Sequence, residues 1–251
     1  MELLHTASLV HDDVVDESNQ RRGQSSVNAM YDNKVSVLVG DYLLATSLKH
    51  AAVTGQIELV DLVSRLGQEL SEGEIIQLAN INNLDFSEEI YFDVIRKKTA
   101  ALFTASAESG AVSVKASEEN IKLAALFGEM IGIAFQIKDD IFDYFENEEL
   151  GKPTGNDMLE GKLTLPALYV LNNKAGEKYR QLALKIRAFE ASRDEIEDFV
   201  RFVKQEGGIE YAQNVMYDYR SRALALLPET ADESVREALT MYIDYVIERN
   251  K

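Results

Sequence analysis

Residues 121–143 read IKLAALFGEMIGIAFQIKDDIFD, an apolar stretch that ends in a group of aspartates. Its apolar residues recur at helical spacing, and residues 124–137 carry a single charge, which favours a buried helix. Asp139, Asp140 and Asp143 stand at the end of this helix. Because Asp139 and Asp143 are four residues apart, we expect their carboxylates to share one face of the helix.

Helical spacing also marks much of the remaining chain. It recurs in residues 59–70 and 94–103, and the three prolines of the chain leave long proline-free stretches, as helices require. No stretch shows the alternation and turn pairs of a strand hairpin. The sequence therefore predicts an all-α fold with one domain over residues 1–251. We expect helix breaks at residues 18–26, 54–56, 80–87, 116–120, 147–161, 172–177 and 228–233.

The composition limits the class of protein. With 251 residues, 46% hydrophobic and 27% charged, the chain is long enough to bury one sizeable core. Every long apolar stretch carries a charge, so we expect no transmembrane helix, and the first residues lack the basic start of a signal peptide. The absence of cysteine excludes disulfides and thiolate chemistry, and it favours a cytoplasmic location.

The chain is acidic, with a formal net charge of −17. A field of this sign repels nucleic acid and acidic membranes, so we expect neither as a partner. It also repels phosphorylated substrates unless cations intervene.

A second aspartate group precedes the first helix break. Residues 11–16 read HDDVVD, so Asp12 and Asp16 are four residues apart and destabilise a helix by like-charge repulsion. A single such pair in an acidic chain is usually a solvated face. Two copies of D-D-x-x-D, each at the end of an apolar helix, instead indicate a divalent cation, and the all-oxygen donor set favours Mg²⁺.

Basic residues accompany both aspartate motifs. Arg21 and Arg22 follow the first motif, Lys152 and Lys162 follow the second, and Lys98 lies between them. Arg21 and Arg22 alone are explained as well by a surface salt bridge. Together with the paired aspartates, the set indicates an anionic ligand held by metal and by basic side chains, and the ligand implied is a diphosphate.

Six strings, in order, then carry a resemblance to a known family: HTASLVHDDVVDESNQRRG, VLVGDYLLA, GEIIQL, KKTAALF, FQIKDDIFDYF and GKPTGNDMLEGKLTLP. From His5 to about Pro166 the chain resembles the trans-type polyprenyl diphosphate synthases, and within them the long-chain, octaprenyl-like type. The resemblance implies a single bundle of helices around a central cavity, the isoprenoid synthase fold. It also implies that the two aspartate motifs face each other across the cavity mouth, and that the protein is a homodimer.

The resemblance assigns roles to individual residues. A cluster of three Mg²⁺ ions with bound substrate would be held by Asp12, Asp16 and Asp139, with Asp13, Asp140 and Asp143 as indirect or water-mediated partners. Arg21, Lys98, Lys152 and Lys162 would contact the allylic diphosphate, whereas His5 and Arg22 would hold isopentenyl diphosphate. Thr99 and Gln136 would direct oxygen atoms at the developing allylic cation. The catalytic set is thus Asp12, Asp16, Lys98, Thr99, Gln136 and Asp139.

The implied reaction is the head-to-tail condensation of isopentenyl diphosphate onto an allylic diphosphate. Magnesium and the basic residues neutralise the leaving diphosphate, the allylic cation forms in a dry cavity, isopentenyl diphosphate adds to it, and the released diphosphate takes a proton. Alternatives are a farnesyl- or geranylgeranyl-length synthase, a class I terpene cyclase and a non-catalytic partner subunit.

The product length is expected to depend on Leu4, Ala7 and Ser8. These residues precede Asp12 on the same helix, and we expect them to line the cavity wall below it. In the family, bulky aromatic residues there stop chain growth, so small Ala7 and Ser8 imply a medium or long all-trans product, such as a quinone side chain. The alternative is that small residues only permit helix packing.

The chain departs from the family at its start. Helices that normally precede the first motif, including an isopentenyl diphosphate-binding Gly-Lys-x-x-Arg segment, are not found in this sequence. We therefore expect a chain that is truncated relative to the family, that binds allylic diphosphate better than isopentenyl diphosphate, and that turns over poorly.

Overall fold

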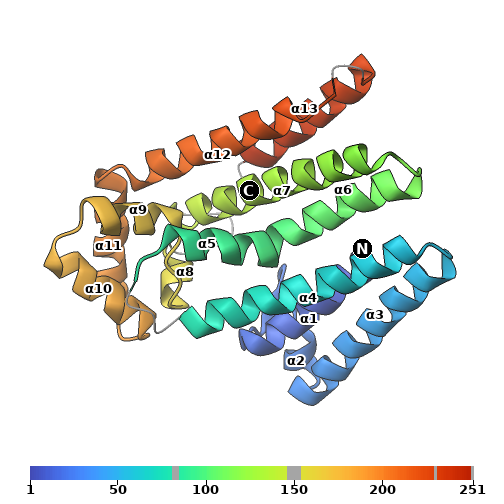
Figure 1. Cartoon of the computed structure of the whole chain (residues 1–251). Coiled ribbons are helices and arrows are strands. Elements are labelled where there is room, and N and C mark those ends of the chain that lie inside the picture. The colour runs from blue at the N-terminus through green and yellow to red at the C-terminus, as the bar shows by residue number, and fades with distance from the viewer. Residues whose placement is uncertain (81–84, 146–153, 229–230, 250–251) are drawn as a thin grey trace.

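The computed structural model describes residues 1–80, 85–145, 154–228 and 231–249. These residues form a helical fold with one small hairpin (Figure 1). The elements are α1 (Glu2–Val15), β1 (Gln20–Arg21), β2 (Gln24–Ser25), α2 (Val27–Met30), α3 (Asn33–Val53), α4 (Ile57–Asn80), α5 (Glu88–Ile95), the π-helix η1 (Arg96–Ala100), α6 (Ala101–Ser113), α7 (Glu118–Phe142), α8 (Asn156–Leu159), α9 (Leu165–Asn173), α10 (Glu177–Arg187), α11 (Arg193–Gln205), α12 (Gly208–Ala225) and α13 (Glu233–Glu248).

Helix α7 is the central element, as its apolar sequence predicts. It packs against α6 on one side and α12 on the other, and Figure 1 shows the three helices running side by side. Ile133 and Ile137 of α7 are completely buried. Gly132 allows the close approach of the preceding segment, because a Cβ atom there would lie 2.5 Å from the Cα atom of Ala100.

Two apolar clusters hold the helices together. The larger cluster surrounds α7 and joins it to α5 and to α9 through α13. The smaller cluster lies between α1, α3, α4 and α6 and contains Leu4, Leu62 and Leu66, all nearly inaccessible to solvent. The first aspartate motif therefore stands at the end of a helix anchored in the smaller cluster, and the second stands at the end of the central helix of the larger one.

The hairpin after α1 was not predicted. Gln20 pairs with Ser25 and Arg21 with Gln24, which leaves Arg22 and Gly23 as a two-residue turn. Their φ angles are 51° and 77°, the left-handed values of the tight turns that suit antiparallel strands. The sequence predicted a helix break here but no strands, because Arg-Gly is a weak turn signal compared with Asn-Gly.

The all-α prediction is confirmed, with corrections to the helix breaks. The break expected at residues 147–161 contains the short helix α8, which begins after the left-handed Gly155. Three breaks in the described residues were missed. One lies at Tyr31 and Asp32, between α2 and α3, and the others follow α10 and α11, where Phe189 and Gly207 take left-handed backbone conformations. In the described residues, α7 is long and apolar enough to cross a membrane. Core helices can have the same length and composition, and α7 lies in the larger apolar cluster.

Candidate active site

A cavity of about 650 Å³ opens between α4, α5, η1, α7 and the segment from α8 to α9. One part of its wall is apolar, formed by Leu78, Ile90, Val94, Ile95, Leu163 and Leu168. The other part is polar and charged, formed among others by Asp16, Glu74, Gln77, Lys98, Thr99, Gln136, Asp140, Asp157, Glu160 and Lys162. A charged mouth beside an apolar chamber suits a ligand with an anionic head and a hydrocarbon tail.

The first aspartate motif ends α1 and places its carboxylates in different surroundings. Asp16 is exposed and lines the cavity. Burial raises the pKa of Asp12, the neighbouring charges of Glu74 and Asp16 raise it further, and Lys98 opposes the shift. Asp12 does not line the cavity, and its carboxylate lies among charges of both signs, so burial is the main cause of the raised pKa.

Asp13 is buried outside the cavity lining and holds Arg21. Its side chain is 4% exposed, and its Oδ1 accepts from both Nε and Nη2 of Arg21 at 2.8 Å. The hairpin β1–β2 brings Arg21 back to α1. This contact orients a basic side chain beside the first motif.

The π-helix η1 supplies Lys98 and Thr99. Lys98 turns towards α4, where its Nζ forms an ion pair with Glu74 and donates to Oε1 of Gln77 at 3.2 Å. Thr99 turns towards α7 and donates from Oγ1 to Oε1 of Gln136 at 2.6 Å. Single π-turns within helices often occur at functional sites, and this one directs two adjacent side chains to different walls of the cavity.

The contact between Thr99 and Gln136 continues into a buried network. Nε2 of Gln136 donates to Oδ1 of Asp140 at 2.8 Å, and the Tyr91 hydroxyl donates to Oδ2 of Asp140 at 2.5 Å. Burial raises the pKa of Asp140 to about 7, although both hydrogen bonds oppose the shift. Burial also raises the pKa of Asp157 well above its ordinary value, and the charge of Asp140 adds to the shift. The network fixes the Gln136 amide in the cavity wall.

The three aspartates of the second motif point in different directions. Asp140 lines the cavity, whereas Asp139 pairs with Arg249 at 2.6 Å. Asp143 accepts from the backbone N–H groups of Asn156 and Asp157 at 2.9 and 3.2 Å, and thereby holds the start of α8. Burial raises the pKa of Asp139, and Arg249 opposes the shift.

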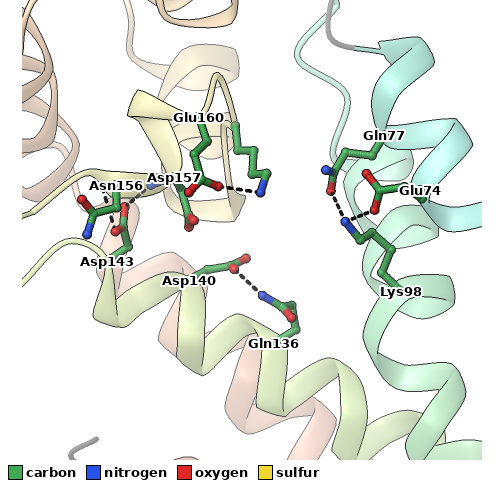
Figure 2. Close-up of polar contacts among 10 residues, drawn as sticks. Glu74, Gln77, Lys98, Gln136, Asp140, Asp143, Asn156, Asp157 and Glu160 are labelled. Atoms are coloured by element: carbon green, nitrogen blue, oxygen red, sulfur yellow. Dashed lines mark hydrogen bonds and ion pairs between the residues drawn. The ribbon is translucent and has the colours of Figure 1, made fainter. Parts of the chain in front are cut away.

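Of the two basic residues predicted after the second motif, only Lys162 belongs to the described residues. Lys162 lines the cavity and pairs with Glu160 at 2.7 Å. Figure 2 shows Glu160 and Asp157 across the opening from Glu74, Gln77 and Lys98. Lys152 lies outside the described residues.

The two residues expected to hold isopentenyl diphosphate lie on α1 and on the hairpin. Arg22 is exposed in the hairpin turn. Burial lowers the pKa of His5, as do the positive charges of Arg22 and Arg21. His5 and the two arginines therefore gather near one another, although neither His5 nor Arg22 lines the cavity.

The three residues expected to set product length do not line the cavity either. Leu4 is 1% exposed and belongs to the smaller apolar cluster, and Ala7 is 2% exposed. Ser8 is half-buried and donates to the carbonyl of His5. They lie on α1 below Asp12, within its helix packing.

The donor set fits magnesium bound together with a diphosphate. In the described part of the chain, no three His, Cys, Asp or Glu side chains gather closely enough to form a complete metal cage. Mg²⁺ is commonly held by one or two carboxylates, with water and phosphate oxygens completing its octahedron. Paired carboxylates such as Asp12 and Asp16 match this mode, because they are four residues apart on α1 and Asp16 lines the cavity.

Sequence reasoning missed several contacts of the site. Glu74 and Gln77 belong to the string GEIIQL, which was recognised but not assigned a role, and helical spacing places both on one face of α4. Tyr91 and Arg249 had no local signal, because their aspartate partners are 49 and 110 residues away in sequence.

Comparisons with known proteins agree with this architecture. The polyprenyl synthetase family model matches residues 1–203. Octaprenyl diphosphate synthase of Escherichia coli is 34% identical over 252 residues, which cover 100% of this chain and 78% of the relative. A crystal structure of geranylgeranyl pyrophosphate synthase from Bacteroides thetaiotaomicron is 56% identical, with a TM-score of 0.89 over 99% of this chain and 78% of that one. A decaprenyl diphosphate synthase structure from Rhodobacter capsulatus is 38% identical, with a TM-score of 0.92 over 100% and 77%.

An all-α fold with two aspartate motifs and a charged cavity mouth defines the class of enzymes that act on prenyl diphosphates. Within that class, the chain belongs to the polyprenyl synthetase family. The family and the prenyltransferase class predicted from the sequence are confirmed.

Proposed function

We propose that the protein catalyses the magnesium-dependent condensation of isopentenyl diphosphate onto an allylic diphosphate to build an all-trans polyprenyl diphosphate. The observation that carries this proposal is the lining of one cavity. Lys98, Thr99, Gln136, Asp16 and Lys162 line this cavity together with several apolar side chains. Names of the relatives, which range from geranylgeranyl to decaprenyl synthases, support the reaction class.

The charged residues would bind and polarise the leaving diphosphate. Asp12, Asp16 and Asp139 would hold magnesium, which when bound neutralises charge that develops on the diphosphate oxygens. Arg21, oriented by Asp13, and Lys98, Lys152 and Lys162 would bind the same group. His5 and Arg22 would hold the second diphosphate.

The cavity wall would then protect the allylic cation. Oxygen atoms of Thr99 and Gln136 would face the cation and stabilise it electrostatically, because their mutual hydrogen bond at 2.6 Å fixes both dipoles. The apolar wall, including Val94 and Leu168, would exclude the water that would otherwise quench the cation. The released diphosphate would accept the proton after condensation.

The reaction is tested by incubation with farnesyl diphosphate and labelled isopentenyl diphosphate, followed by chromatography. Elongated diphosphates would support the proposal. A hydrocarbon product would indicate a terpene cyclase. The absence of any product, even after incubation for hours to detect slow turnover, would indicate a partner subunit. The second D-D-x-x-D motif, at Asp139–Asp143, favours elongation because cyclases usually carry an Asn/Ser/Glu metal motif there.

For product length, we propose a medium or long chain, such as a quinone side chain. The support is that the small residues Ala7 and Ser8, which pack on α1 outside the cavity lining, place no bulky side chain below Asp12. A geranylgeranyl-length product is the second candidate, favoured by the 56% identity to a geranylgeranyl pyrophosphate synthase. Ala7→Tyr tests the length-setting role, and it should shorten the product towards farnesyl diphosphate. Thr6→Tyr, at an exposed position of the same helix, should not. An unchanged product from a folded Ala7→Tyr variant would refute the assignment of Ala7.

We also propose that the chain forms one domain, works in the cytoplasm and assembles as a homodimer. The absence of cysteine supports the location. Leu38, Tyr42 and Val53 of α3 are exposed large apolar side chains, which supports an association surface on that helix. Sedimentation would measure the oligomeric state.

A further inference from the structure

Arg249 connects the end of the last helix to the second aspartate motif. It follows α13, and its Nη2 donates to Oδ1 of Asp139 at 2.6 Å and to the carbonyl oxygen of Phe135 at 3.2 Å. Its guanidinium carbon lies 3.9 Å from the ring centroid of Phe135 and 5.7 Å from that of Phe142. The Arg249 side chain is only 16% exposed. This is a packed contact, unlike the mobile ion pairs typical of a protein surface.

The contact occupies one face of α7. Phe135, Asp139 and Phe142 are spaced by four and three residues, so their side chains lie above one another on the helix. Arg249 lies across this face and uses both the aromatic surfaces and the carboxylate. Asp140, the next residue along α7, instead lines the cavity.

We propose that Arg249 is a positioning residue that holds Asp139 as a counter-ion, and that magnesium binding at the second motif displaces it and releases the end of α13 from α7. This proposal rests on the proposed role of Asp139 as a magnesium ligand. Two cations compete for the same carboxylate, since Oδ1 of Asp139 already accepts a short charge-assisted bond and a guanidinium repels a neighbouring metal ion.

A second ion pair on α13 provides a matched control. Nε of Arg220 on α12 lies 2.6 Å from Oδ1 of Asp244 on α13. Arg220→Gln removes an ion pair of the same length from the same helix without touching the second motif. A change caused only by loosening of α13 would therefore be common to Arg220→Gln and Arg249→Gln.

The direct test is titration of the substrate-free protein with Mn²⁺ alone, followed by electron paramagnetic resonance. Arg249→Gln should bind Mn²⁺ about three- to tenfold more tightly than the wild type, because Asp139 is 40% exposed and the loss of such an ion pair changes the free energy by about 1 kcal/mol. Arg249→Lys should fall between them, and Arg220→Gln should match the wild type. The rate of amide hydrogen exchange in residues 245–249 should rise in the wild type when Mn²⁺ is added, because displacement of Arg249 would release the end of α13. Bound ligands usually lower exchange rates, so this rise is specific to the proposal.

The outcomes separate this proposal from the proposed metal site. Suppose that Mn²⁺ binding is lost in Asp139→Asn and therefore depends on Asp139. If a folded Arg249→Gln variant then binds Mn²⁺ no more tightly than the wild type, the role of Arg249 alone is overturned. No Mn²⁺ binding by the wild type, or binding that Asp139→Asn leaves unchanged, would overturn the metal site at Asp139 and this proposal with it.

Discussion

Asp13 is the buried carboxylate of the first motif, and its contact with Arg21 links the packing of α1 to the basic side of the site. Both guanidinium bonds to Asp13 are 2.8 Å long. The backbone carbonyl of Asp13 also accepts from Asn28, so the residue holds the hairpin region through two groups. Arg21 can therefore present its remaining donors in one orientation.

Asp13→Asn should release Arg21 and raise the KM for the allylic diphosphate about tenfold or more, with a smaller effect on kcat. It should also lower the free energy of unfolding by about 1–2 kcal/mol, a value discounted because Arg21 is partly exposed. Steady-state kinetics and denaturant unfolding measure the two effects. Asp244→Asn, which breaks the pair with Arg220 between α12 and α13, should affect stability but leave KM unchanged. An unaltered KM in Asp13→Asn would contradict the positioning role.

Asp140 makes stability depend on pH. Burial raises its pKa from 3.8 to about 7, so the folded state favours the protonated form. The stabilisation from that form is complete below about pH 4, is lost as pH rises through about 7, and changes little above it. From pH 5 to 7.5 in EDTA, wild-type stability should fall by about 2–3 kcal/mol relative to Asp140→Asn. Denaturant unfolding across this range measures the difference, and parallel pH profiles would rule out this titration.

At the scale of elements, the π-helix η1 depends on a close approach to α4. Gly73 of α4 faces η1, and a Cβ atom at this position would lie 2.8 Å from Cγ of Lys98, 2.9 Å from Cβ of Lys97 and 3.0 Å from the backbone nitrogen of Lys98. The last contact involves backbone, which cannot rotate away. The missing side chain at Gly73 therefore permits the geometry in which Lys98 reaches Glu74.

Gly73→Ala should push η1 away from α4, reduce kcat at least tenfold and destabilise the fold by about 1–3 kcal/mol. Gly67→Ala on the same helix is the matched control, since a Cβ there meets only Cδ1 of Leu44, at 3.9 Å. It should be neutral or stabilising by up to about 1 kcal/mol, because alanine favours a helix over glycine. Assays of turnover and thermal unfolding compare the two variants. Equal behaviour would contradict the close-packing account.

Element by element, local patterns predicted most of the fold. The apolar spacing of residues 121–141 was enough to predict a buried α7, and the polar stretch after Asp16 was enough to predict a break. The hairpin was missed because its turn uses Arg22 in a left-handed conformation, which a sequence pattern does not favour. The π-turn was missed because no residue type in Arg96–Ala100 distinguishes it from an α-helix.

At the scale of the whole molecule, the site combines contacts of two kinds. The pairs within each aspartate motif are local, so their spacing alone predicted a cation site. Contacts such as Tyr91 with Asp140 and Arg249 with Asp139 join distant segments, and they follow only from how the helices pack. The family resemblance supplied Thr99 and Gln136, whose hydrogen bond joins η1 to α7.

The net charge of −17 is compatible with a diphosphate site because the charges are arranged locally. Lys98 and Lys162 line the cavity mouth, and Arg21 stands beside the first motif. Paired carboxylates would recruit magnesium to the same place. The acidic exterior therefore opposes nucleic acid without preventing diphosphate binding at the mouth.

The most direct test of this account is the magnesium dependence of chain elongation. The measurement is the incorporation of labelled isopentenyl diphosphate into acid-labile polyprenyl products, followed over hours to detect slow turnover. Incorporation should be absent in EDTA and should rise as Mg²⁺ is added. It should fall at least a hundredfold in Asp12→Asn and in Asp139→Asn. Elongation in EDTA, or undiminished elongation by both folded variants, would contradict the claim that the two aspartate motifs act through magnesium on the leaving diphosphate.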